Sequence, residues 1–138
     1  MLLFDEHGGC LFQRRSDTGL WEFPAGACEP GSTFAGTAVE ELREETGLHV
    51  AEGDLVPFGA LSDPEVHVIR YPNGDLTHCF ALCFAAYRWT GTVTVEADEV
   101  LEARFFDLDH APQPLHPPTS AVLDMYRQFL ATGRFQAR

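Results

Sequence analysis

The chain has 138 residues, a length that fits one domain with a hydrophobic core of its own. Its formal net charge of -12, from 9 basic and 21 acidic residues, opposes binding to a nucleic-acid polymer or to an anionic membrane surface. The sequence has no run of 18 apolar residues and no charged-then-apolar leader. We therefore expect a soluble, cytoplasmic protein with a single domain over residues 1–138.

The first part of the chain alternates short apolar stretches with turn-forming residues. Residues 1–4 and 10–14 are predicted to form the two strands of a hairpin, joined by the turn sequence DEHGG at 5–9. Residues 20–23 alternate between apolar and polar side chains, which predicts another short strand that ends at Pro24.

One amphipathic helix is predicted over residues 34–46. Phe34, Ala38 and Leu42 recur every four residues and predict a buried stripe along that helix. Ser32 or Thr33 can cap its N-terminus. Gly47 follows its last residue, where a left-handed residue commonly ends a helix.

The second half of the chain is richer in strands. Strands are predicted at 55–61, 66–71, 77–89 and 100–106, with a turn at 71–75. A short strand is predicted at 92–95 after a turn at Gly91, a loop at 107–118, and a final helix at 120–132 that stops at Gly133. This order of elements predicts an α+β fold, with helices packed on the faces of a mixed sheet.

The four cysteines are predicted to be reduced thiols. They show no CxxC spacing, so they match neither a zinc site nor a convincing disulfide framework. These residues are Cys10, Cys28, Cys79 and Cys83.

Four glutamates crowd the second half of the helix at 34–46: Glu40, Glu41, Glu44 and Glu45. Like charges four residues apart destabilise a helix by roughly 0.2–0.5 kcal/mol per pair. The helix dipole also favours cations at this end, and only Arg43 supplies one. This arrangement favours neutralisation by something outside the chain, such as a divalent metal ion.

The spacing of three of these glutamates favours a shared ion. Glu41, Glu44 and Glu45 stand at i, i+3 and i+4, so their carboxylates project from one face of the helix. Such hard oxygen ligands suit Mg²⁺ or Mn²⁺. Metal ions held in this way can hydrolyse a phosphoric anhydride. The alternative interpretation is a solvated acidic face.

Residues 26–48 resemble the signature of the Nudix hydrolases, which reads Gly, five residues, Glu, seven residues, Arg-Glu-apolar-x-Glu-Glu-x-Gly-apolar. The flanks resemble the family too, with QRR at 13–15, LWEFPAG at 20–26 and ARFFDLD at 103–109. The matching signature positions are Gly26, Glu41, Leu42, Glu44, Glu45, Gly47 and Leu48.

This resemblance implies an α/β/α sandwich of the Nudix type, with a mixed β-sheet between helices. It also implies Mg²⁺ dependence and cleavage of nucleoside diphosphates linked to another moiety. Glu41, Glu44 and Glu45 would be the metal ligands, joined by the backbone carbonyl of Ala25. Family members commonly dimerise, so a homodimer is possible.

Two signature positions depart from the family pattern. Ser32 stands where the first glutamate is expected, and Glu40 stands where an arginine is expected. In the family that arginine orients the metal-binding glutamates, so Glu40 reverses the local charge. Arg43 could stand in for it. We predict weaker metal binding than with a complete signature, and the alternative function is a catalytically weakened module that binds a nucleotide or a protein.

The general base is expected on a loop near the last strand. Family enzymes vary here, and some use a loop acid beyond the sheet. Glu96, Asp98 and Glu99 lie where such an acid would be expected, and Glu99 is the first choice. The alternative for Glu99 is a solvated turn acid.

Three residues are candidates for binding the substrate, which we expect to be a small nucleotide or another diphosphate. Trp21 lies close to the metal loop and could stack on a base or ribose, although such aromatic residues are more often core. Arg14 and Arg70 belong to the scarce cations that could meet phosphates, although single surface arginines usually bind no ligand.

Overall fold

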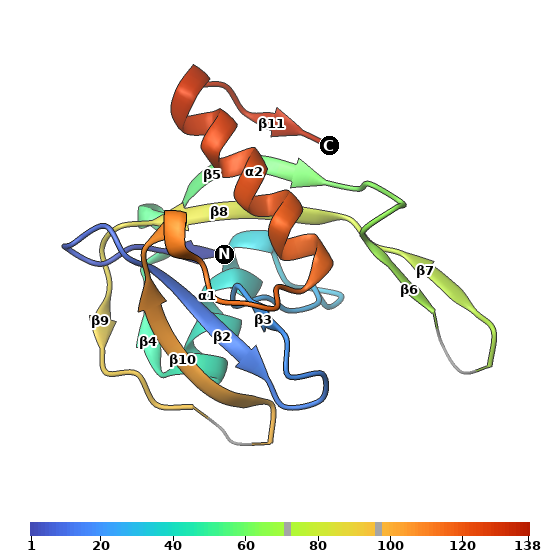
Figure 1. The fold of residues 1–138 in the computed structure, drawn as a ribbon, viewed down its shortest axis with the longest axis horizontal. Helices are drawn as coiled ribbons and strands as arrows, with labels where there is room; N and C mark the ends of the chain where they lie inside the picture. The colour runs from blue at the N-terminus through green and yellow to red at the C-terminus, as the bar shows by residue number, and fades with distance from the viewer. Residues whose placement is uncertain (71–72, 96–97) are drawn as a thin grey trace.

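The computed structural model describes residues 1–70, 73–95 and 98–138 (Figure 1). The turn predicted at 71–75 is therefore only partly described, as is the strand predicted at 66–71. Glu96, one of the loop acids considered above, lies outside the described residues.

Four strands form the largest sheet: β1 (Leu2–Leu3), β5 (Val56–Leu61), β8 (Ala81–Ala86) and β11 (Gln136–Ala137). Their order is β1-β8-β5-β11. β1 runs parallel to β8, β5 runs antiparallel to β8, and β11 runs parallel to β5. The sheet is therefore mixed, as predicted.

The other strands form smaller sheets. β2 (Cys10–Arg15) lies between β3 (Trp21–Glu22) and β10 (Val100–Phe106) in an antiparallel sheet. β4 (Leu48–His49) pairs with β9 (Thr90–Gly91), and β6 (Val68–Arg70) pairs with β7 (Leu76–His78). In Figure 1 the β6–β7 hairpin projects away from the rest of the fold.

Helix α1 (Phe34–Thr46) has the predicted bounds because both of its ends are fixed locally. The Thr33 hydroxyl accepts a hydrogen bond from the backbone N–H of Gly36 at 3.0 Å, so Thr33 is the N-cap. Gly47 adopts a left-handed φ of 71°, and its N–H donates to the carbonyl of Arg43. The predicted stripe is only partly correct, because Leu42 is fully buried but Phe34 is 50% exposed.

Helix α2 (Pro117–Thr132) starts three residues earlier than predicted. Its first two residues are prolines, which the first turn of a helix tolerates because its N–H groups have no partner within the helix. Gly133 ends the helix in a left-handed conformation, as predicted. Two short 3₁₀ turns, η1 (Glu52–Asp54) and η2 (Leu108–His110), complete the helical segments of the described residues.

The central strands lie between the two helices. Successive side chains of a strand point to opposite faces of a sheet. Alternate residues of β1, β2 and β8 accordingly belong to two separate hydrophobic clusters, one of which includes α2 residues and the other Leu42 of α1. The predicted α/β/α sandwich is therefore confirmed. The α2 cluster contains Leu2, Phe12 and Ala85, and the α1 cluster contains Leu3, Leu11 and Ala86.

The predicted N-terminal hairpin is wrong in its pairing. Leu2 and Leu3 pair in parallel with Ala85 and Ala86, and only a single antiparallel bridge joins Phe4 to Cys10. Leu2 and Leu3 are both fully buried. Strands buried on both faces are typical of parallel pairing. The DEHGG turn therefore connects two different sheets, with β1 in the four-stranded sheet and β2 in the three-stranded sheet.

Two further strand predictions need correction. The strand predicted at 77–89 is divided, because residues 76–78 pair with β6 whereas residues 81–86 pair with β5 and β1. The strand predicted at 92–95 lies instead at Thr90–Gly91, where it pairs with β4, and Gly91 is a strand residue rather than a turn residue. Both errors arise because distant partners decide where a strand ends.

The four cysteines are all free, as predicted: Cys10, Cys28, Cys79 and Cys83. Neither α1 nor α2, the helices of the described residues, is long and apolar enough to span a membrane.

Candidate active site

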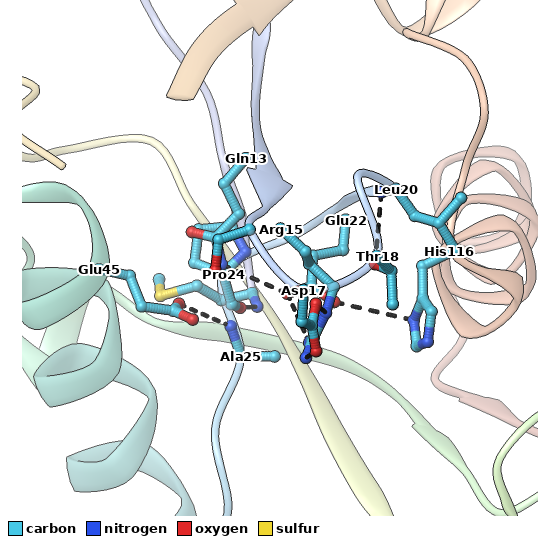
Figure 2. Close-up of polar contacts among 12 residues, drawn as sticks. Gln13, Arg15, Asp17, Thr18, Leu20, Glu22, Pro24, Ala25, Glu45 and His116 are labelled. Atoms are coloured by element: carbon cyan, nitrogen blue, oxygen red, sulfur yellow. Dashed lines mark hydrogen bonds and ion pairs between the residues drawn. The ribbon is translucent and has the colours of Figure 1, made fainter. Parts of the chain in front are cut away.

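The carboxylate of Glu45 is buried in the last turn of α1. Glu45 is 9% exposed, and its Oε2 accepts a hydrogen bond from the backbone N–H of Ala25 at 3.1 Å (Figure 2). Burial raises the pKa of the Glu45 carboxyl to about 7, and the charge of Glu22 acts in the same direction. Burial disfavours the charged form of a carboxyl group, so a bound cation would stabilise this carboxylate.

Glu41, one turn earlier on α1, lies directly against the backbone of Gly26. A Cβ atom at position 26 would overlap the Glu41 carboxyl group, so only glycine allows this close approach. Partial burial raises the pKa of the Glu41 carboxyl, and the charges of Glu44 and Glu99 raise it further. The loop at 24–26 thus brings its backbone against both Glu41 and Glu45.

The third predicted ligand, Glu44, is exposed and points to a different partner. Its Oε1 accepts a hydrogen bond from Nη2 of Arg43 at 3.0 Å. Among the described residues, no three His, Cys, Asp or Glu side chains are arranged to hold a metal ion. The structure therefore brings Glu41, Glu45 and Ala25 together, but it leaves Glu44 paired with Arg43.

The chemistry of this donor set fits a hard divalent cation. Glu41 and Glu45 supply carboxylate oxygens whose pKa values are raised by burial and by neighbouring negative charge. Oxygen ligands of this kind are those that Mg²⁺ and Mn²⁺ prefer. Glu45 is buried and Glu41 is half-buried, so two negative charges here are less favourable than on a fully solvated face, and a cation would stabilise them.

Glu99, the predicted general base, lies just before β10. Its side chain is exposed, and its charge contributes to the raised pKa of Glu41. The backbone of this loop is tied to the end of β2, because Ser16 donates its N–H to the carbonyl of Glu99 at 2.9 Å and its hydroxyl to the carbonyl of Asp98 at 2.6 Å. The fold therefore brings a loop acid into the electrostatic range of α1.

Of the three predicted substrate-binding residues, Trp21 and Arg14 are cross-strand partners, whereas Arg70 lies on a separate hairpin. Trp21 is 5% exposed, and its ring packs edge-on against Phe106 with the centroids 5.1 Å apart, which is the placement of a core residue. Arg14 forms an ion pair of 3.6 Å with Glu102 on the neighbouring strand. Arg70 is exposed on the projecting β6–β7 hairpin, away from α1 in Figure 1.

Sequence reasoning missed a buried polar network beside Glu45. Glu22 is 7% exposed and accepts two hydrogen bonds from Nη1 of Arg15, at 3.1 and 3.2 Å. Gln13 donates to Glu22 at 3.4 Å, and Nδ1 of His116 lies 3.7 Å from Glu22. Figure 2 shows these side chains between Glu45 on one side and His116 on the other. The alternation of polar and apolar residues in LWEFP does not indicate that the Glu22 side chain is buried.

The sequence pattern of the NUDIX domain family matches residues 1–126, most of the chain, including the loop at 24–26 and the acidic helix. The chain belongs to the NUDIX domain family. The family resemblance of residues 26–48 is therefore confirmed. Glu41, Glu44 and Glu45 all lie on α1.

Named relatives and a solved structure agree with the NUDIX assignment. The chain is 31% identical over 117 residues to the mouse protein "nucleoside diphosphate-linked moiety X motif 6", covering 83% of this chain and 35% of that protein. It is 29% identical over 119 residues to an ADP-ribose pyrophosphatase of Methanocaldococcus jannaschii, covering 85% and 64%. The crystal structure of an ADP-ribose pyrophosphatase from Streptococcus suis has the same fold, with a TM-score of 0.71, 20% identity, and coverage of 99% and 92%.

The two residues that depart from the NUDIX signature, Ser32 and Glu40, both lie on the surface near α1. Ser32 is exposed, and Thr33 rather than Ser32 caps α1. Glu40 is exposed and pairs with Nη2 of Arg43 at 3.4 Å, the same nitrogen that contacts Glu44. Arg43 therefore neutralises part of the extra charge that Glu40 adds to this NUDIX helix.

Proposed function

We propose that this NUDIX domain is a hydrolase that depends on Mg²⁺ or Mn²⁺ and cleaves the diphosphate linkage of a nucleoside diphosphate derivative. The observation that carries the proposal is the pair of carboxylates, Glu41 and Glu45, held with raised pKa values against the backbone of the 24–26 loop. The names of the mouse and archaeal relatives, which refer to nucleoside diphosphates and ADP-ribose, support the substrate class.

The proposed metal ligands are the carboxylates of Glu41, Glu44 and Glu45 and the carbonyl of Ala25. A divalent cation bound to them would supply Lewis-acid polarisation of a phosphoryl oxygen. The chain's own contribution is to fix two of the carboxylates before any ion binds, through the contact of Glu41 with Gly26 and the hydrogen bond from Ala25 to Glu45. Such preorganisation lowers the free energy needed to assemble the site.

Glu99 is the proposed general base. Its charge already raises the pKa of Glu41, which supports a position from which it can take a proton from the attacking water. Arg14, on the strand beside Glu102, is the remaining candidate from the sequence for contact with a phosphate.

The direct test is a panel of nucleoside diphosphate derivatives, including ADP-ribose, incubated with the purified protein and Mg²⁺ or Mn²⁺. We expect release of a nucleoside monophosphate or phosphate that stops when the metal is chelated. A control with Glu45→Gln should show little turnover, because the carboxylate is lost while the side-chain shape is kept. Turnover that is unaffected by chelation would contradict the proposal.

A second candidate function is a NUDIX module that binds a nucleotide without cleaving it. The specific observation in its favour is the pairing of Arg43 with both Glu40 and Glu44, which occupies one predicted metal ligand. Retained binding of ADP-ribose in calorimetry, together with no turnover on the whole panel, would favour this module over the hydrolase.

A further inference from the structure

Ser16, the first residue after β2, makes two hydrogen bonds to the loop that carries Glu99. Its backbone N–H donates to the carbonyl of Glu99 at 2.9 Å. Its hydroxyl donates to the carbonyl of Asp98 at 2.6 Å, across 82 positions of the sequence. A single half-buried serine therefore holds two successive residues of a distant loop.

These two bonds lie at the end of the pairing between β2 and β10. Arg15 is the cross-strand partner of Val100, and the N–H of Ser16 continues this ladder by one step. The chain then turns toward β3, and the N–H of Gly19 donates back to the carbonyl of Arg15 at 3.0 Å. Because the backbone turns away from β10 after Ser16, the serine hydroxyl supplies the next donor to the loop.

Both acceptors adjoin the Cα atom of Glu99. The carbonyl of Asp98 belongs to the peptide group before Glu99, and the carbonyl of Glu99 belongs to the peptide group after it. Peptide groups are planar, so the rotations of these two groups set φ and ψ of the residue between them. Holding both groups therefore fixes the direction in which the exposed Glu99 side chain leaves the backbone.

The segment that leads to this loop is also attached to the end of α1. Thr94 donates its N–H to the carbonyl of Thr46, the last residue of the helix, at 2.9 Å. A Cβ atom at Gly47 would lie 2.1 Å from Oγ1 of Thr94, so the segment passes directly against the helix end. Thr94 and Ser16 thus connect the two ends of the segment at 94–99 to α1 and to β2.

The hydrogen bonds from Ser16 leave the carboxylate of Glu99 free. Partial burial and the charges of Glu44 and Glu99 raise the pKa of the Glu41 carboxyl, and like charges this close repel one another. A cation at position 16 would weaken this repulsion, but it would also compete for the Glu99 carboxylate. A neutral serine that binds only backbone carbonyls places the acid without occupying the oxygens that a general base uses.

We propose that Ser16 is a positioning residue, which directs the side chain of Glu99 by holding the two peptide groups on either side of it. The catalytic importance of this contact rests on the proposed function, in which Glu99 is the general base. A misplacement of about 1 Å can reduce the rate of an enzyme by about 10²-fold, so the direction of this side chain affects turnover.

The contact itself is tested without metal or substrate, by ¹⁵N relaxation of the Glu99 backbone amide. Ser16→Ala removes the hydroxyl and keeps the N–H, so the order parameter should fall from about 0.85, typical of rigid backbone, toward about 0.6. Ser16→Thr keeps a hydroxyl and should retain the wild-type value. Thr18→Ala is the matched control, because its hydroxyl contacts the N–H of Leu20 within the same turn. An unchanged order parameter in Ser16→Ala, or an equal fall in Thr18→Ala, would overturn the proposal.

The consequence for catalysis is tested by combining Ser16→Ala with Glu99→Gln. A residue that acts through Glu99 should lower kcat by about tenfold on its own, with little change in KM, and should lower it no further once Glu99 is replaced. Ser16→Thr should restore kcat. Equal losses of kcat with and without Glu99, or wild-type kcat in Ser16→Ala, would contradict the positioning role.

The two proposals fail in different ways. A wild-type protein that hydrolyses nothing on the panel contradicts the proposed hydrolase, while the order parameter of Glu99 still decides whether Ser16 holds it. An active protein whose Glu99→Gln variant is fully active contradicts the catalytic role of Ser16 and leaves the proposed hydrolase standing.

Discussion

The backbone of Gly26 and the carboxyl group of Glu41 are in such close contact that no Cβ atom fits between them. This contact joins the loop before α1 to the middle of the acidic face, 15 positions later in the chain. The same loop donates the N–H of Ala25 to Glu45. The two proposed ligands are thus fixed by backbone groups, which have little freedom to move.

Gly26→Ala should therefore impair activity more than stability. The new methyl group forces Glu41 out of its position, and small displacements of catalytic groups can reduce the rate by about 10²-fold. We expect a large fall in kcat/KM for the best substrate of the panel, with unfolding by urea changed by about 1–3 kcal/mol. Gly53→Ala, where a Cβ atom meets no neighbour, is the matched control. Equal activity of both variants would argue against the fixed position of Glu41.

The metal-free protein should lose stability as the pH rises. The pKa of Glu45 is raised from its ordinary value of 4.5 to about 7 in the folded state. The folded protein therefore binds more protons than the unfolded chain within this window, and the free energy of unfolding falls as the pH increases through it, by about 3 kcal/mol in total for Glu45. The raised pKa of Glu41 acts in the same direction.

Urea unfolding in the presence of a chelator, at pH 5 and at pH 8, measures this effect. Glu45→Gln should reduce the difference between the two pH values, because its side chain does not titrate. A difference that is the same in the wild type and in Glu45→Gln would show that Glu45 does not have the raised pKa.

Glu40→Arg should tighten metal binding. It restores the arginine expected by the NUDIX signature and removes the acid that shares Arg43 with Glu44. We expect half-maximal activity at a Mg²⁺ concentration several-fold lower, whereas Glu40→Gln, which removes the acid without supplying a cation, should give a smaller change. An unchanged Mg²⁺ requirement in Glu40→Arg would count against the predicted effect of this departure.

Glu99→Gln should lower kcat with little effect on metal affinity. Loss of a general base typically reduces the rate by about 10²–10⁴-fold. Asp98→Asn, the neighbouring change on the same exposed loop, should retain most of the activity. Full activity of Glu99→Gln would remove Glu99 from the mechanism.

Local signals account for the parts of the fold that the sequence predicted well. The bounds of α1 depend on Thr33 and Gly47, which act within one turn of the helix ends, so they could be recognised without knowledge of the rest of the fold. The parallel pairing of Leu3 with Ala86 depends on residues more than 80 positions away, and nothing near Leu3 specifies it.

The candidate site was predictable only where helix periodicity decides it. Glu41 and Glu45 share one face of α1 because of their spacing. Gln13 and Glu22 belong to strands whose alternation shows two faces but not which of them another element will cover. Both residues are buried in the folded protein, whereas Trp21, on the opposite face of β3, lies in the hydrophobic cluster that includes α2 residues.

The central claim is that the carboxylates of α1 bind a divalent cation that hydrolysis of a diphosphate requires. Its most direct test is the rate of ADP-ribose hydrolysis as a function of Mg²⁺ concentration, for the wild type and for Glu45→Gln. We predict saturable activation by Mg²⁺ in the wild type and a rate at least about 10²-fold lower in Glu45→Gln. Hydrolysis without Mg²⁺, or an undiminished rate in Glu45→Gln, would contradict the claim.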